Sequence, residues 1–346
     1  MDNVHFYFGL IILAFVITFL LMIPFIGFLY RMKFQRSAET QEVRKSATRA
    51  FYKIREMHAV KVGVPTGGGI LVSAVVIVIF GVVFLIRNGQ MISGHELWRE
   101  LGVILLTFSG FGALGFYDDV IKIFGFAKTG FFGLRMRQKF LLQLLVGLAV
   151  GAFLYFGLGI DIINIPIVGR YFHLEWGIIP LAAFLIVGFA NSFDFTDGLD
   201  GLSGGLLMIC LMAFVVIASR ELDEVLLTFI VLWLGALMAY LYFNIFPARI
   251  MLGNVGGLAF GATLAVIGLL SGKTVALLVI GGIFLAEGMS SLLQLFSKKF
   301  MKKRIFPIAP FHHWLQLLGW EEPKIVARAW LAGFILAVFG VWLAVL

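Results

Sequence analysis

The stretch VHFYFGLIILAFVITFLLMIPFIGFLY (residues 4–30) contains no lysine, arginine, aspartate or glutamate. A helix needs about 20 consecutive apolar residues to cross the hydrocarbon core of a bilayer. The run is too long for the apolar core of a cleavable signal peptide, and no small-residue cleavage site follows it. We therefore expect residues 4–30 to form a membrane-spanning helix.

Comparable apolar runs recur along the chain, which is 61% hydrophobic and only 13% charged. A soluble domain would be about one quarter charged, and the strands of a membrane barrel would alternate over about ten residues. The sequence thus predicts an all-α polytopic membrane protein, organised as a single domain over residues 1–346. We expect about ten spans, near residues 4–30, 68–86, 101–116, 140–157, 176–191, 199–218, 225–244, 252–270, 274–296 and 325–346.

Lysine and arginine are concentrated in alternate loops. Of the 27 basic residues, 21 lie in five loops, five lie in the loops between them, and Arg328 lies in the last span. Because cytoplasmic loops carry the excess of basic residues, these five loops are predicted to be cytoplasmic and both termini to be outside. The five loops are residues 31–67, 117–139, 192–198, 245–251 and 297–324.

Polar clusters fall in the same five loops or at the adjoining ends of spans. Such groups are costly beside a membrane unless they face water, a metal or a partner. The loops are defined by basic residues alone, whereas the clusters consist mainly of acids, amides and histidines. Their coincidence therefore predicts an active site at the cytoplasmic face. The clusters are KVGVPTGGG (61–69), FYDDVIK (116–122), NSFDFTDGLDGL (191–202), FNIFPARIMLGN (243–254) with Asn244 and Asn254, and the pair His312–His313.

Asp118 and Asp119 end the third predicted span. Adjacent residues on a helix point about 100° apart, so one carboxylate can face a metal while the other faces the bundle. Lys122 lies one turn beyond Asp118 and shares its face. The alternative is a solvated helix end.

Asp194, Asp197 and Asp200 lie within seven residues and have no basic neighbour in sequence. They need a divalent cation, hydrogen-bond donors or a distant lysine or arginine, unless Asp197 or Asp200 simply caps the next span. Oxygen ligands suit Mg²⁺ or Mn²⁺, and Mg²⁺ held by few carboxylates usually also binds substrate phosphates. The basic loops could contribute further phosphate contacts through Lys61, Lys122 and Lys139. Phosphoryl transfer requires little beyond a metal, positive charge and positioning.

Four other residues are candidates for a function: a histidine pair, an acid within a span and the cysteine. His312 and His313 could bind a metal, a phosphate or a polar ligand, or form a structural pair at the membrane interface, but their spacing does not suit zinc. Glu287 lies within a predicted span, so it is either functional or a buried partner of a neighbouring helix. Cys210 is the sole cysteine, which excludes an internal disulfide and a thiolate metal cluster.

At this point the motifs carry a resemblance over nearly the whole chain, in order and spacing. KVGVPTGGG, GFYDDVIK, NSFDFTDGLDGLS, FNIFPARIMLGNVGG and KRIFPIAPFHHWLQLLGWEEPKIVAR resemble the phospho-N-acetylmuramoyl-pentapeptide transferases. These belong to the wider superfamily of polyprenyl-phosphate sugar-1-phosphate transferases. The resemblance implies an Mg²⁺-dependent enzyme of the bacterial inner membrane. It would move phospho-muramoyl-pentapeptide from UDP to undecaprenyl phosphate, release UMP and so form the first lipid-linked intermediate of peptidoglycan synthesis.

The resemblance also implies roles for individual residues. Asp118 would contact the lipid phosphate or act as a base, and the other catalytic candidates are Asp119, His312 and His313. The metal candidates are Asp118, Asp194 and Asn254. Candidates for substrate binding are Lys61, Thr66, Lys122, Lys139, Asn191, Asp197, Asp200, Asn244 and Met251. The expected partners are the UDP-linked substrate, undecaprenyl phosphate and the bilayer, without nucleic acid, and a homodimer is an open alternative to a monomer.

This chain departs from the family pattern at the proposed metal site. Asn254 replaces an aspartate, Met251 replaces a phenylalanine expected to stack on uracil, and Asp194 replaces an asparagine. One hypothesis is that Asp194 restores the carboxylate missing at Asn254. The alternative is a catalytically impaired homologue that binds lipid-linked intermediates.

Two further functions stay open from the sequence. One is a transfer reaction of the same superfamily with another UDP-sugar. The other is ion-coupled transport, since acids within spans also mark transporters, although these bind their ions near the middle of the membrane.

Overall fold

The computed structural model describes residues 4–35, 49–87, 91–124, 136–166 and 168–346. Within these ranges nine helices are long and apolar enough to cross a membrane, or up to ten if one bent pair is a single span. A multi-pass helical membrane protein is therefore confirmed. The nine are α1 (Val4–Arg31), α4 (Gly68–Ile86), α5 (Leu97–Ile123), α6 (Met136–Ala152, continued by η3, Phe153–Gly157), α7 (Ile178–Thr196, preceded by η4, Glu175–Gly177), α8 (Leu202–Glu221), α9 (Glu224–Asn244), α10 (Gly253–Leu270) and α14 (Glu322–Val345).

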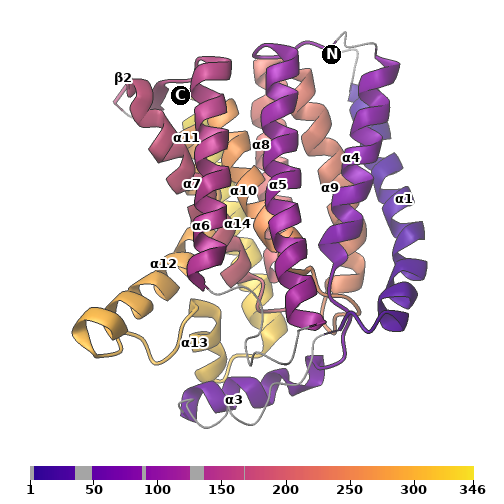
Figure 1. Cartoon of the computed structure of the whole chain (residues 1–346), viewed down its shortest axis with the longest axis vertical. Helices are drawn as coiled ribbons and strands as arrows, with labels where there is room; N and C mark the ends of the chain where they lie inside the picture. Colours follow the sequence, from indigo (N-terminus) through magenta and orange to yellow (C-terminus); the bar gives the residue numbers. More distant parts are fainter. Residues whose placement is uncertain (1–3, 36–48, 88–90, 125–135, 167) are drawn as a thin grey trace.

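The helices form an upright bundle with α9 and α10 at its centre (Figure 1). α10 packs between α5 and α7, and α1 packs along α9. Gly115 of α5 lies so close to α10 that an added Cβ would overlap the backbone carbonyl of Asn254. Small residues at such crossings let two helix backbones approach. This contact brings the end of α5 beside the beginning of α10.

The predicted span at residues 274–296 is not one straight helix. The chain forms α11 (Thr274–Ile280) and α12 (Gly282–Phe296, continued by η5, Ser297–Met301), which are bent by 76°. The break lies at Gly281, where an added Cβ would overlap the ring of Phe189. The length of an apolar run predicts a span, but it does not predict whether the helix is straight. The glycine pair at 281–282 permits the break. As a result α12 leaves the bundle at an angle (Figure 1).

Two other elements differ from expectation. α5 runs from Leu97 to Ile123 rather than over 101–116, and α7 runs to Thr196 rather than to 191, so the acidic motifs begin on the helices themselves. A short antiparallel hairpin, β1 (Ile162–Ile165) and β2 (Arg170–His173), lies between α6 and α7, in a loop for which no strands were predicted. The β-branched isoleucines of β1 favour a strand there.

The short elements α3 (Arg49–Met57), η1 (His58–Lys61) and α13 (Phe311–Leu317) lie at one end of the bundle, at the lower end in Figure 1. α5, α7 and α9 end there, and α8, α10 and α14 begin there. α1 begins and α14 ends at the opposite end. The polar motifs are thus gathered at a single end, while the side of the membrane that this end faces stays a prediction from the basic residues.

Candidate active site

The carboxylate of Asp118 lies at the centre of a polar network near the end of α5. It is 1% exposed. It accepts a hydrogen bond from Asn254 Nδ2. Its Oδ2 also lies 2.9 Å from Lys122 Nζ and 3.3 Å from Lys139 Nζ. The prediction that Lys122 shares the face of Asp118 is therefore confirmed, and the structure adds an ion pair between them.

Lys139 of α6 joins Asp118 to Asp194. Its Nζ lies 3.0 Å from Asp194 Oδ2 on α7. Asp194 also lies against α10, because a Cβ added at Gly257 would be 2.9 Å from Asp194 Oδ1. Gly257 is one turn beyond Asn254 on the same helix. Asp118, Asp194 and Asn254 therefore come from three helices and surround one region that a single ammonium group bridges.

This region fits Mg²⁺, which the resemblance implies. Within the described residues no group of three acids, histidines or cysteines is arranged to hold a metal. Mg²⁺, however, usually takes one or two protein carboxylates and completes its shell with water and substrate phosphates. Asp118 and Asp194 both lie in reach of one cation, Lys139 Nζ. Asn254 adds a neutral amide beside them.

Asp119 faces a different direction from Asp118, as expected for neighbours on a helix. Its Oδ2 accepts the backbone N–H of Val255 at 3.3 Å. A Cβ added at Gly253 would lie 2.9 Å from that oxygen and 3.0 Å from Thr66 Oγ1. Gly253 has a φ of +79°, which favours glycine. Asp119 and Thr66 therefore approach the first turn of α10 together.

Met251 is buried and holds the glycine-rich segment in place. Its carbonyl oxygen accepts the N–H groups of Gly67 at 3.0 Å and Gly68 at 2.9 Å, and its own N–H donates to Pro65 O at 2.8 Å. The segment KVGVPTGGG is thus tied by its backbone to the segment that enters α10. No sequence pattern indicated this pairing between two loops far apart in the chain.

Lys61 is buried between two carboxylates. Its Nζ lies 2.7 Å from Asp200 Oδ1 and 2.6 Å from Glu322 Oε1, at the beginning of α14. Asp200 also accepts the N–H of Ala248 at 2.9 Å. From the sequence, Lys61 was predicted to contact phosphate, and Glu322 was not predicted to belong to the site. The structure shows an ion-pair network that joins η1, the loop before α8 and α14.

Gly201, rather than an aspartate, occupies the N-cap position of α8, with a φ of +78°. Its N–H donates to Asn244 Oδ1 at 3.0 Å, and Asn244 Nδ2 donates to Ile250 O at 2.9 Å. Asp197 accepts the hydroxyl of Ser203 at 2.5 Å. Asn244 therefore organises the loops around the site, and the capping alternative for the acidic cluster is not what the structure shows.

Asn191 lies one turn before Asp194 on α7. Its Nδ2 donates to Gln143 Oε1 of α6 at 2.7 Å and to Val187 O at 2.8 Å. Gln143 is buried and was not selected from the sequence. An amide within an apolar span was the signal that could have identified it.

The histidine pair lies on α13, beside α12. His312 pairs with Glu287, so Glu287 does contact a neighbouring helix. His313 Nδ1 lies 3.0 Å from Gln316 Oε1, which also lies 3.3 Å from His58 Nε2. Burial, and to a smaller extent the neighbouring His312, lowers the pKa of His313 to about 2. His313 is therefore a neutral group at physiological pH.

The histidine pair of α13 lies beside the acidic loop between α7 and α8. His312 Nε2 lies against Gly198, where an added Cβ would overlap it. Gly198 directly follows Asp197 and lies two residues before Asp200 in the sequence. The structure thus brings the histidines to the acidic loop, although their motifs are more than 100 residues apart in the sequence.

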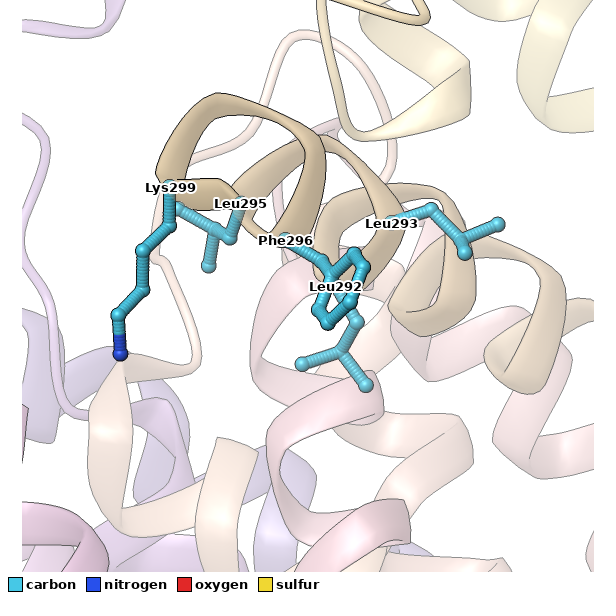
Figure 2. Close-up of a pocket in the computed structure, with 5 residues that line it drawn as sticks. All are labelled: Leu292, Leu293, Leu295, Phe296 and Lys299. Carbon is cyan, nitrogen blue, oxygen red and sulfur yellow. The ribbon is translucent and has the colours of Figure 1, made fainter. Parts of the chain in front are cut away.

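An open cavity of about 390 Å³ lies on α12, outside the aspartate network. Figure 2 shows four apolar side chains along this stretch, with Lys299 reaching away beyond them. The lining combines apolar surface with one cationic group. The apolar residues are Leu292, Leu293, Leu295 and Phe296.

Comparisons with known proteins place this arrangement in context. The family model for glycosyl transferase family 4 matches residues 101–272, which include Asp118, Lys139, Asp194 and Asn254. A phospho-N-acetylmuramoyl-pentapeptide-transferase of Bacillus pumilus is 35% identical over 336 residues, 97% of each chain. The proteins of the same name from Oceanobacillus iheyensis and Bacillus subtilis are each 34% identical, again over 97% of both chains.

Proposed function

Because this chain belongs to the phospho-N-acetylmuramoyl-pentapeptide-transferase family, we propose that it transfers phospho-muramoyl-pentapeptide from UDP to undecaprenyl phosphate. The observation that carries the proposal is the network of Asp118, Lys139, Asp194 and Asn254 at one end of a helix bundle. The similarity extends over 97% of both chains, which favours this substrate over another UDP-sugar. An acidic and basic cluster at a bundle end is also unlike the mid-membrane site of a transporter.

In the net reaction a phosphate oxygen of the lipid attacks the sugar-linked phosphorus of the UDP substrate. A new P–O bond forms, the bond to UMP breaks, and UMP leaves with the electron pair. Asp118 and Asp194 would hold Mg²⁺ with Asn254 beside them, and the ion would neutralise phosphate charge when bound. Phosphate groups placed there would compete with the two carboxylates for the ammonium of Lys139.

The chain's own residues divide into two sets. We assign substrate contact to Lys122 and Lys139, whose ammonium groups lie beside Asp118. We add Asp197 in the acidic loop, and Thr66 and Asn191 at the margins of the region. Preorganised charge of this kind stabilises a phosphoryl-transfer transition state without reorganisation. The second set supports the loops, because its contacts join the loops to one another or to α14: Lys61, Asp200, Asn244, Met251 and Glu322.

Asp118 is the proposed base or anchor for the lipid phosphate. It is the most buried carboxylate of the network and faces two lysines. Asp119 shapes the first turn of α10 beside it. The cavity on α12 suits an isoprenoid chain, because its lining is apolar and Lys299 adds one positive charge at its edge.

The setting of the reaction follows from the basic loops. We place the site at the cytoplasmic face of the bacterial inner membrane, with both termini outside. A nucleotide substrate is available on that side. The net charge of +8 suits an anionic leaflet and anionic substrates, and we propose no nucleic-acid role for it.

The test is UMP release by purified protein given Mg²⁺, undecaprenyl phosphate and UDP-muramoyl-pentapeptide. We expect release that depends on all three components. A parallel reaction with UDP-N-acetylglucosamine is the control for substrate class. Release with that nucleotide alone would assign the chain to another branch of the superfamily, and absence of release with either would support a binding role.

A further inference from the structure

Glu287 and His312 form a two-point contact that is buried in the protein. Glu287 lies on α12 and is 4% exposed. Its Oε1 accepts the backbone N–H of His312 at 3.1 Å, and its Oε2 lies 3.1 Å from His312 Nδ1. One carboxylate therefore fixes both the beginning of α13 and the plane of the imidazole.

This contact determines which nitrogen of His312 carries the proton. An ionised carboxylate can only accept hydrogen bonds, so Nδ1 must donate and therefore carries hydrogen. His312 is 1% exposed, and its Nε2 has no hydrogen-bond partner in the part of the chain that the structure describes. A charged Nε2–H without an acceptor would cost more than an unused lone pair, because orphaned buried N–H groups are rare. The neutral form with a bare Nε2 is the less costly one.

The bare nitrogen faces the acidic loop. Nε2 lies against Gly198, directly after Asp197, where only a residue without a side chain can fit. Buried polar atoms without a partner are few in native proteins, and each calls for a reason such as a ligand. Hydrogen bonds used in catalysis also tighten only when substrate is bound. A lone pair repels phosphate oxygens, so a hydroxyl or amide N–H suits it better.

We propose that Glu287 is a positioning residue that holds His312 with its proton on Nδ1, so that Nε2 accepts a hydrogen bond from a hydroxyl or amide N–H of the UDP-linked substrate. The inference rests on the proposed function. It assigns His312 to the sugar or peptide part of that substrate rather than to its phosphates. It also gives Glu287, the acid on α12 of the bent helix pair, a specific role beyond packing.

The decisive variant is Glu287→Gln, which keeps the volume of the side chain. Its amide nitrogen can donate to Nδ1, which would move the imidazole proton to Nε2 and turn an acceptor into a donor. In a Ser-His-Asp triad the corresponding change lowers kcat by about 10⁴. We expect kcat/KM for the UDP-linked substrate to fall at least about 10²-fold, while KM for undecaprenyl phosphate stays within about twofold.

The matched control is Ser290→Ala on the same helix. It removes the hydrogen bond from Ser290 Oγ to the backbone carbonyl of Glu287 and leaves the carboxylate intact. Its kinetics should match those of the wild type. If neither the wild type nor this control releases UMP, the proposed function fails. If Glu287→Gln is as active as the wild type, only the present inference is overturned.

A spectroscopic measurement tests the tautomer without relying on activity. The chain has 6 histidines, and ¹⁵N-histidine solid-state NMR of the protein in lipid bilayers can assign His312 by the signals lost in His312→Asn. We expect a protonated Nδ1 and an unprotonated Nε2 in the wild type, and the reverse in Glu287→Gln. A protonated Nε2 in the wild type would overturn the inference, even if the variant fails to fold.

Discussion

Lys139 Nζ lies 3.0 Å from Asp194 Oδ2, and the same ammonium lies 3.3 Å from Asp118 Oδ2. Asn254 donates to Asp118 from a third direction. Asp194 and Asn254, the two positions at which the resemblance implies an exchange of amide and carboxylate, thus contact one network. This is the arrangement that charge compensation between them requires.

Double exchange at these positions tests the compensation. Asp194→Asn should weaken Mg²⁺-dependent UMP release, because Mg²⁺ affinity depends on how many carboxylates converge. Asn254→Asp in the same chain should restore much of that loss, giving a coupling of about 0.5–3 kcal/mol in a double-mutant cycle. The measurement is UMP release against Mg²⁺ concentration for all four proteins.

Two outcomes would contradict compensation. Strict additivity would show that the two positions act independently. Activity that appears only on Asn254→Asp would show that the natural chain is a binding homologue of low activity.

Lys61→Met tests whether Lys61 is structural. Removing the ammonium leaves the carboxylates of Asp200 and Glu322 buried without their counter-ion. Breaking one partner of a buried ion pair costs about 3–5 kcal/mol. We expect a large fall in thermal stability in detergent, compared with the exposed control Lys303→Met. Unchanged stability with weaker nucleotide binding would instead make Lys61 a phosphate ligand.

His313 predicts a specific pH dependence of stability. Its pKa in the folded protein is about 2, because burial disfavours its charged form, whereas an unfolded histidine titrates near pH 6.5. Below about pH 6.5 the unfolded state binds a proton that the folded state does not, so stability falls by up to about 1.4 kcal/mol per pH unit.

The variant His313→Gln removes this titrating group. It should lose less stability between pH 6.5 and pH 5 than the wild type does. Above about pH 7 the pH dependences of the two proteins should run parallel. Thermal unfolding across this range measures the difference. Parallel curves throughout would show that the pKa of His313 is not lowered in the folded protein.

Single cysteines test the predicted orientation. Lys303→Cys should react with an impermeant thiol reagent only from the cytoplasmic side, and Arg170→Cys only from outside. The natural Cys210 is buried and provides a low background. Reversed labelling would place every polar motif on the wrong side of the membrane for a nucleotide substrate.

The sequence predicted the spans well, because uninterrupted apolar runs are a direct consequence of bilayer thickness. It also predicted that Asp118 and Asp119 would face different directions, and that Lys122 would share the face of Asp118. These relationships depend only on helix geometry, and the structure shows both.

Contacts between distant segments could not be predicted in this way. The approach of Asn254 to Asp118 depends on the close packing of α5 and α10 at Gly115. Glu322 acquires its partner Lys61 only when η1 reaches the beginning of α14. The bend at Gly281 likewise depends on the ring of Phe189, which no local pattern reports.

Asp118 is proposed to take part directly in transfer to a lipid. The most direct measurement follows UMP and the lipid-linked product together, in the wild type, in Asp118→Asn, and in Asp161→Asn as a matched control at the opposite end of the bundle. We expect about one lipid product per UMP in the wild type and the control. In Asp118→Asn we expect kcat to fall by about 10²–10³ with nucleotide still bound, because one charge at the reacting centre is lost. UMP release without lipid product, or full turnover by Asp118→Asn, would contradict a role of Asp118 in that transfer.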